Sequence, residues 1–141
     1  MSTPVPMLPR LDLFRVEDAM HAGLVACDPT ATLPVIARLF AEQRIHCVIV
    51  SGIERTRAGE RLTWGVVSDR DLMRALDATD ASITAGALAV SALVTVEPQE
   101  SLDSAVRLMA AYDTTHVIVV ENDYPVGIVS ALDVARAAGG A

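Results

Sequence analysis

The sequence predicts a mixed α/β fold of the α+β kind, with two tandem β-α-β-β-α repeats packed as one module about a pseudo-two-fold axis. The first observation is a repeat, because the block Val25–Leu33 recurs sixty-nine positions later as Val94–Leu102. The second is composition: 52% of the 141 residues are hydrophobic but only 4% are aromatic, which indicates a core of aliphatic strands and helices. One repeat would be marginally stable alone, so two are expected to share a core.

Each repeat is expected to contain the same five elements. A short strand ends at an acidic residue and a proline, and a helix with an apolar face follows. A continuously apolar strand comes next, and a hairpin joins it to a third strand and a final helix. In the first repeat these are a strand at 24–27, a helix with Thr32 as N-cap, strands at 47–50 and 63–67, and a helix from Ser68. In the second they are a strand at 93–96, a helix with Ser101 as N-cap, strands at 116–120 and 125–129, and a helix from Ser130.

The connections differ between the repeats. The first hairpin, Ser51–Thr63, is rich in arginine and glutamate and is predicted to be a solvated loop, whereas Glu121–Tyr124 predicts a compact turn. Residues 16–20 predict a short helical lead-in to the first repeat. The predicted boundaries are an N-terminal arm at 1–15, repeat 1 at 16–76, a small and polar linker at 77–86, and repeat 2 at 87–141.

Charge and hydropathy argue against several functional classes. The formal net charge is −7 and all 11 basic residues are arginine, so nucleic-acid binding is not expected. No apolar run approaches the about 18 residues of a membrane helix. The first fifteen residues lack the apolar segment of a secretory signal, so a cytoplasmic location is expected. Cys27 and Cys47 form no CxxC pattern and are predicted to be buried, reduced thiols.

One motif occurs in both repeats, at the junction of the third strand and the final helix. A glycine, two apolar residues, a serine, two further residues and an aspartate form Gly65–Asp71 and again Gly127–Asp133. The spacing of three predicts that the serine caps the helix and that the aspartate lies in its first turn. A carboxylate accepts hydrogen bonds from two adjacent hydroxyl groups, and a helix N-terminus favours phosphate.

With this paired motif the chain resembles the family of cystathionine-β-synthase-type (CBS) domains over residues 16–137. The resemblance implies a cleft between the two repeats with two related pockets for an adenosine-containing ligand. In it the aspartate would bind the ribose hydroxyls, the serine would bind the ribose or phosphate, and apolar residues would line the adenine. The residues implied for the first pocket are Ser68, Asp71, Arg70, Val66, Ile45 and His46. Those implied for the second are Ser130, Asp133, Ile128, Thr115 and His116.

Each of these features also has a structural interpretation. Ser-x-x-Asp is equally the pattern of a capping box, and the glycines suit close strand approach. Arg70, between Asp69 and Asp71, could neutralise a phosphate or be an exposed surface residue. The histidines and cysteines show no metal-ligand spacing, so no metal site is predicted.

The expected function is that of a regulatory module without catalytic activity, since no nucleophile and base can be assembled. It would bind AMP, ADP, ATP or an S-adenosylmethionine-like compound as effector, need no cofactor, and signal to an effector protein that the sequence does not identify. The alternatives are a ligand-independent dimerisation scaffold and a metal- or redox-responsive stress protein. A homodimer is expected from the excess of aliphatic residues, in either orientation, through helices around 35–40, 72–76, 105–111 and 134–138.

Overall fold

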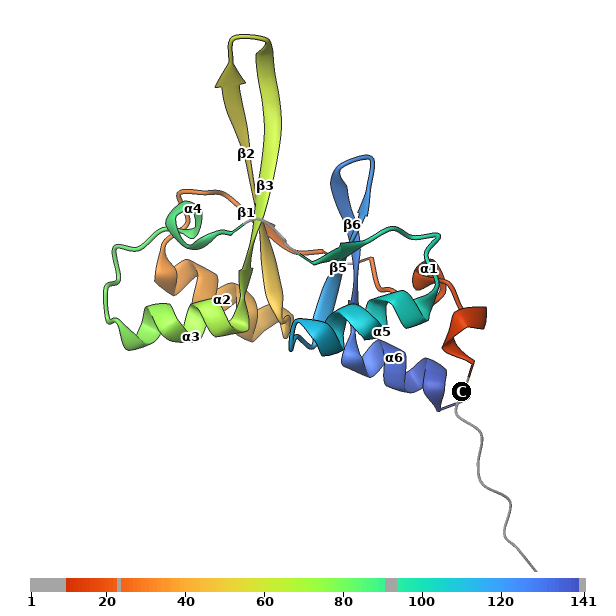
Figure 1. Cartoon of the computed structure of the whole chain (residues 1–141). Helices are drawn as coiled ribbons and strands as arrows, with labels where there is room; N and C mark the ends of the chain where they lie inside the picture. The colour runs from red at the N-terminus through yellow and green to blue at the C-terminus, as the bar shows by residue number, and fades with distance from the viewer. Residues whose placement is uncertain (1–9, 23, 91–93, 140–141) are drawn as a thin grey trace, which may run out of the picture. The chain divides into compact units, whose positions relative to one another are not determined.

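The computed structural model describes residues 10–22, 24–90 and 94–139. These residues divide into two packing units. The first unit contains residues 24–90, and the second contains residues 94–139 together with 10–22. Each unit has the β-α-β-β-α order that the sequence predicts (Figure 1). The mixed α/β fold class is therefore confirmed.

The first unit has a three-stranded sheet in the order β1-β2-β3. Strand β1 is parallel to β2, and β2 is antiparallel to β3. The parallel pair needs a crossover, which the helix α2 provides. The elements are β1 (Ala26–Cys27), α2 (Leu33–Gln43), β2 (Cys47–Thr56), β3 (Gly59–Ser68), α3 (Asp69–Asp77) and α4 (Ala85–Leu88).

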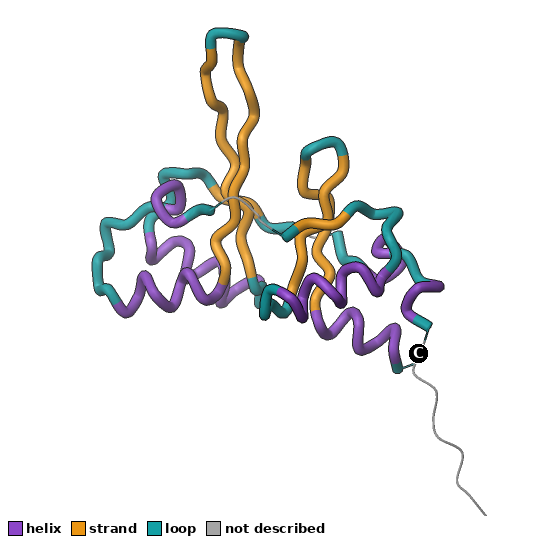
Figure 2. Tube along the Cα trace, viewed as in Figure 1, coloured by secondary structure: helices purple, strands orange, loops and turns teal. Residues whose placement is uncertain are grey.

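The second unit repeats this topology with the sheet order β4-β5-β6, and Figure 2 shows both sets of strands in orange. The elements are a 3-10 helix η1 (Leu11–Leu13), α1 (Val16–Ala19), β4 (Thr95–Val96), α5 (Leu102–Ala111), β5 (His116–Glu121), β6 (Tyr124–Ser130) and α6 (Ala131–Ala138). None of the helices in the described part of the chain combines the length and apolarity needed to cross a membrane.

Each unit has its own aliphatic core between the sheet and its helices. In the first, Ile36 of α2 and Val48 of β2 are fully buried. In the second, Leu102 of α5 and Val117 of β5 are buried at the corresponding depth. The middle strands are buried at residues 47–50 of β2 and 117–119 of β5, as their continuous apolar sequences predict.

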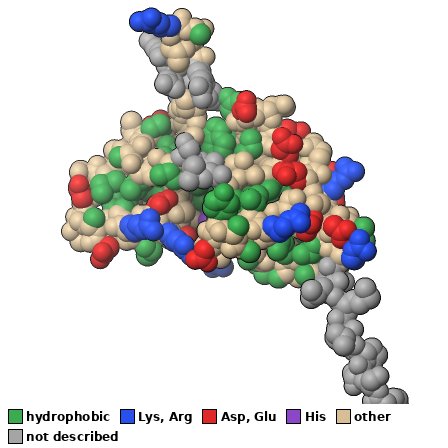
Figure 3. Space-filling view, viewed as in Figure 1, with side chains coloured by type: hydrophobic (Ala, Val, Ile, Leu, Met, Phe, Trp, Pro, Cys, Tyr) green, Lys and Arg blue, Asp and Glu red, His purple; other side chains and the backbone are tan. Residues whose placement is uncertain are grey.

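The prediction of a solvated loop at Ser51–Thr63 is wrong. The β2–β3 ladder continues through this stretch, from the pair Ser51–Trp64 to the pair Thr56–Gly59. A two-residue turn then suffices, and Gly59 ends it with a φ of 120°, a conformation that favours glycine. Polar residues can continue a strand because a projecting ladder needs no buried face. Figure 3 shows a basic side chain at the tip of this hairpin, where Arg57 is exposed.

The short helix before each repeat packs in the unit of the other repeat. Helix α1 leads into the strands and helices of the first repeat, yet Val16 is fully buried in the core of the second unit. Helix α4 precedes the second repeat, and Ala85 is fully buried in the first unit. The contacts match in the repeat register: Val16 N donates to Glu100 O, and Ala85 N donates to Ala31 O, both at 2.8 Å.

The packing units therefore divide the chain at different places from the predicted repeats. Residues 16–22 fall within the predicted repeat 1 but lie in the second unit. Helix α4 begins within the predicted linker but belongs to the first unit. The two divisions differ because each lead-in helix buries an apolar side chain in the core formed by the other repeat, Val16 in the second unit and Ala85 in the first. The boundaries of the sequence repeats themselves stay a prediction.

Candidate functional site

The motif glycines lie in the third strand of each sheet, where a lead-in segment crosses it. We use this name for the residues that follow the lead-in helices, 20–21 after α1 and 89–90 after α4. A Cβ on Gly65 would lie 3.1 Å from Ala89 Cβ and 3.2 Å from Val90 O. A Cβ on Gly127 would lie 2.9 Å from Met20 Sδ and 3.1 Å from the carbonyl oxygen of His21. All four distances are shorter than ordinary van der Waals contact. Close strand approach therefore explains the glycines in both copies.

The first motif forms a complete capping box at the start of α3. The Asp71 amide donates to Ser68 Oγ at 3.1 Å. In return, Asp71 Oδ2 accepts from the Ser68 amide and from the Ser68 hydroxyl, both at 2.9 Å. Both side chains are half-buried. The capping interpretation is therefore confirmed, and Asp71 Oδ1 has no hydrogen-bond partner among the described residues.

The second motif forms the same capping box at the start of α6. The Asp133 amide donates to Ser130 Oγ at 3.2 Å, and Asp133 Oδ2 accepts from the Ser130 amide at 2.8 Å and from its hydroxyl at 2.9 Å. Here the aspartate is buried, with only 8% of its surface exposed. The two motifs thus share their local geometry but differ in how accessible the carboxylate is.

The other residues predicted for the first pocket lie close to the start of α3. The His46 carbonyl accepts from the Asp69 amide at 2.9 Å, and His46 Nδ1 lies 3.5 Å from Asp69 Oδ2. Arg70 is exposed, makes no ion pair with a described residue, and its amide donates to Asp69 Oδ1 at 2.8 Å. The first-turn amides of α3 are therefore already bonded within the protein, so they do not offer a phosphate the free donors of an uncapped helix N-terminus.

The predicted apolar walls are only partly accessible. Val66 of β3 is buried and exchanges two backbone hydrogen bonds with Val90, at 2.9 and 3.1 Å. Ile45 is half-buried at the edge of the first core. Of the two, Ile45 presents the larger share of its surface.

The second pocket has the corresponding arrangement. Ile128 exchanges two backbone hydrogen bonds with His21, both at 3.0 Å. Thr115 is exposed, its carbonyl accepts from the Ala131 amide at 2.8 Å, and His116 beside it is half-buried. Thr115 and His46, which share one repeat position, thus accept the first helical amide in the same way.

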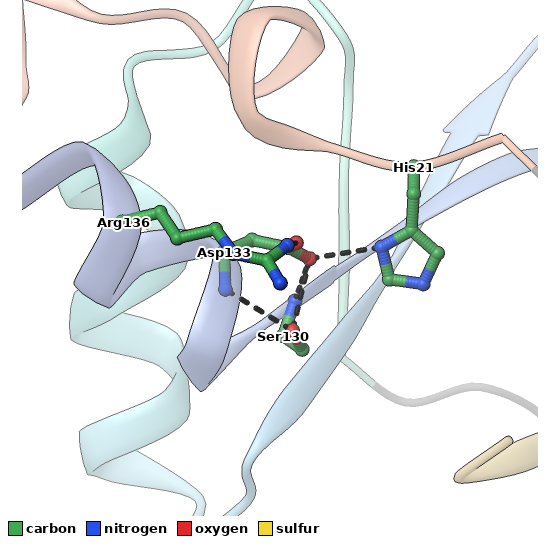
Figure 4. Close-up of polar contacts among 4 residues, drawn as sticks. All are labelled: His21, Ser130, Asp133 and Arg136. Carbon is green, nitrogen blue, oxygen red and sulfur yellow. Dashed lines mark hydrogen bonds and ion pairs between the residues drawn. The ribbon is translucent and has the colours of Figure 1, made fainter. Parts of the chain in front are cut away.

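Two residues that are not among the predicted site residues contact the second motif (Figure 4). His21 Nδ1 lies 3.0 Å from Asp133 Oδ2, and its side chain is 55% exposed. Arg136 Nη1 lies 3.9 Å from Asp133 Oδ1. Extending the repeat register backwards pairs His21 with Val90, and that comparison would have marked position 21 as one where the two repeats differ.

Asp133 also borders a surface pocket of about 310 Å³. The pocket lies beside α1 and α6 of the second unit, and its lining includes the aromatic ring of Phe14 and the charged groups of Asp18 and Arg136. Its volume is at the lower limit of small-molecule sites, which is about 300 Å³. A larger pocket of about 650 Å³ lies along β4 and contains none of the predicted site residues.

The two cysteines do not favour thiol chemistry. Burial, and secondarily the charge of Asp69, raises the pKa of Cys47 to about 11. Burial also raises the pKa of Cys27, with a smaller effect from Asp28. Reactive cysteines instead have lowered pKa values, because the thiolate is the nucleophile. Among the described residues, no three His, Cys, Asp or Glu side chains come together as metal ligands.

Comparison with known proteins agrees with this repeated architecture. A family model described as the CBS domain matches the chain twice, at residues 16–78 and 85–140. A search of curated proteins gave no match.

Three solved structures illustrate the similarity. A CBS domain protein from Pyrobaculum aerophilum complexed with AMP is 28% identical, covers 85% of this chain and 89% of its own, and gives a TM-score of 0.70. Hypoxic Response Protein I with two coordinated zinc ions is 29% identical, with 86% and 97% covered and a TM-score of 0.68. A CBS domain pair in complex with 5′-methylthioadenosine and S-adenosyl-L-methionine shares the fold at 21% identity, with 89% and 96% covered and a TM-score of 0.72. The chain therefore belongs to the CBS-domain family, of which it contains two tandem repeats.

Proposed function

We propose that this chain is a non-catalytic regulatory module that binds an adenosine-containing ligand at its Ser-x-x-Asp motifs and signals occupancy to a partner protein. The observation that supports this most directly is Asp71, whose Oδ2 is held by Ser68 while Oδ1 has no partner among the described residues. A fixed carboxylate with an open oxygen is suited to a ribose diol. The 28%-identical relative complexed with AMP supports the same ligand class.

In the first site the two ribose hydroxyls would donate to Asp71. The Ser68 hydroxyl would meet the ribose or phosphate, and the exposed guanidinium of Arg70 would neutralise the phosphate charge. The half-buried Ile45 would border the adenine, with Val66 behind it and His46 at the entrance of the strand. AMP, ADP, ATP and S-adenosylmethionine share the adenosine moiety that these residues would bind.

In the second site Ser130 and Asp133 would have the roles of Ser68 and Asp71. The position of Val66 would be taken by Ile128, and that of His46 by Thr115. His116 would lie next to Thr115 at the entrance of the strand. Position 132, which corresponds to Arg70, is leucine, so a phosphate would gain less there. Phosphorylated adenosines are therefore expected to favour the first site.

A thermal-shift screen tests the proposed function. AMP, ADP, ATP, S-adenosylmethionine and NAD would be added at a hundredfold excess over Kd, where a bound ligand stabilises the folded state by about 2.7 kcal/mol. At least one adenosine-containing ligand is expected to raise the melting temperature by several degrees, whereas guanosine and cytidine should not. The proposed function is wrong if no adenosine compound shifts the transition at millimolar concentration.

The role of Arg70 is tested by replacing it with alanine. AMP binding is expected to weaken by up to about 1 kcal/mol, the upper end of the range for an exposed ion pair, and adenosine binding should not change. Arg74→Ala, in the same helix, is the matched control and should leave both affinities at the parent value. Calorimetric titration measures all of these, and an equal loss for AMP and adenosine would contradict a phosphate contact.

A second candidate function, the ligand-independent dimerisation scaffold, is favoured by exposed apolar side chains on the helices of the first unit. Met73 and Leu76, three residues apart on α3, are 57% and 43% exposed, and Val35 of α2 is 43% exposed. Other residues in the predicted interface, such as Phe40 and Leu72, are buried in the core and cannot contribute.

Light scattering at micromolar concentration is expected to report a homodimer that Met73→Asp converts to a monomer. The exposed apolar face loses its partner when a charge replaces part of it. Leu132→Asp on α6, at a side chain 59% exposed, shows whether the second unit contributes. A parent protein that is monomeric at these concentrations would rule out the dimer.

A further inference from the structure

The lead-in segments cross the two motifs with the same backbone contacts but different side chains. His21 exchanges two backbone hydrogen bonds with Ile128, and Val90 exchanges two with Val66. These four residues correspond in the repeat register, so His21 and Val90 occupy equivalent positions. Valine has no side-chain donor, whereas histidine has one that reaches the aspartate of its motif.

In the second motif this donor occupies one oxygen of the aspartate, Oδ2 of Asp133. Asp133 Oδ2 accepts from the Ser130 amide, from the Ser130 hydroxyl and from His21 Nδ1, at 2.8, 2.9 and 3.0 Å. A carboxylate can only accept, so His21 Nδ1 must bear the hydrogen. The other oxygen, Oδ1, faces the Arg136 guanidinium at 3.9 Å, and only 8% of the residue is exposed. Both oxygens thus have a cationic or polar side chain beside them.

In the first motif the aspartate has neither of these two side-chain contacts. Asp71 Oδ2 accepts only from Ser68, and no described side chain lies within ion-pair distance of Asp71. We infer that His21 is a specificity-determining residue that closes the second motif to ribose by occupying Asp133. This inference rests on the proposed function. A ribose diol has one hydroxyl for each carboxylate oxygen. At Asp71 both hydroxyls reach an acceptor directly, whereas at Asp133 the hydroxyl that approaches Oδ2 must first displace the imidazole.

The displaced bond sets the size of the effect. A hydrogen bond to a charged group corresponds to about a tenfold change in affinity, taking the lower end of the usual range. Adenosine is therefore expected to bind the second motif about tenfold more weakly than the first. Nucleosides without ribose hydroxyls do not compete with His21, so their affinities should not show this tenfold difference.

The experiment first inactivates one motif by replacing its aspartate with alanine. It then gives the remaining motif the residue that the other motif has at the equivalent position, valine for His21 or histidine for Val90. On Asp71→Ala, which leaves the second motif, His21→Val is expected to tighten adenosine binding about tenfold. On Asp133→Ala, which leaves the first motif, Val90→His is expected to weaken it by a similar factor. The affinity for 2′,3′-dideoxyadenosine should change in neither pair. Calorimetry gives the affinities, and circular dichroism checks that each variant is folded.

The outcomes separate this inference from the proposed function. If His21→Val leaves adenosine affinity unchanged or weakens it, the inference is wrong and His21 supports the ligand or the fold instead. An equal effect on adenosine and the dideoxy analogue would overturn it as well. Should one aspartate variant not fold, the reciprocal pair still decides the question. If the parent binds no adenosine compound at all, the proposed function itself fails.

Discussion

Replacing Asp71 with alanine is expected to weaken adenosine binding at the first motif by about 1.5–3 kcal/mol, the range for hydrogen bonds to a charged group. The variant loses the acceptor that two ribose hydroxyls share. Dideoxyadenosine should lose little on the same change, because it never made the contact. Titration of the parent and the variant with both nucleosides gives the two differences directly.

The capping box makes a control necessary, since Asp71 also accepts from the Ser68 amide. Losing that bond should lower the free energy of unfolding by about 1 kcal/mol. Asp77→Ala removes the same charge from the exposed end of α3 and should change neither nucleoside affinity. A folded Asp71→Ala protein with parental adenosine affinity would mean that the residue only caps the helix.

Replacing Val16 with aspartate is expected to lower the free energy of unfolding of the second unit by about 3–5 kcal/mol, since it leaves a buried charge without a partner. Val16 has no exposed surface and packs in the core around Leu102 and Val117. Hydrogen exchange should therefore accelerate in β5 and β6, while the first unit keeps more of its protection.

The matched control is Glu17→Ala, one position along in α1, where the side chain is exposed. Its effect should stay within about 0.5 kcal/mol, as for other surface positions. Faster exchange confined to β2 and β3 in Val16→Asp would contradict the assignment of α1 to the second unit.

The internal repeat made much of the fold predictable. Two matched blocks gave the order of strands and helices, and the continuous apolar runs identified β2 and β5 as buried strands. Thr32 and Ser101 are the N-caps of α2 and α5 as predicted, although neither side chain accepts a capping hydrogen bond from a helix amide. A periodic pattern of apolar residues is sufficient for such elements, because local burial decides them.

Non-local packing was not predictable in the same way. Helix α1 packs in the second unit and α4 in the first, because each completes the core there. A sequence repeat predicts where such a short helix lies in the chain, but not which core it packs against. The long β2–β3 hairpin was missed because its polar residues resemble those of a loop. Only the register of the ladder distinguishes the two.

The candidate site shows a further limit. Ser-x-x-Asp predicts both a capping box and a ribose site, since each needs the carboxylate in the first turn of the helix. The structure confirms the capping hydrogen bonds, but these leave the ligand role of Asp71 open to test. His21 was missed because it lies before the blocks from which the repeat was recognised, more than a hundred residues from Asp133 in the sequence.

The most direct test of the proposed ligand site is a calorimetric titration of the double variant Asp71→Ala/Asp133→Ala with AMP, beside the parent protein. The parent is expected to bind AMP, and the folded double variant is expected to bind it about 1.5–3 kcal/mol more weakly at each motif, because both ribose acceptors are gone. Circular dichroism and thermal unfolding establish that the variant is folded. A folded double variant that binds AMP as tightly as the parent would contradict the assignment of the ligand site to these motifs.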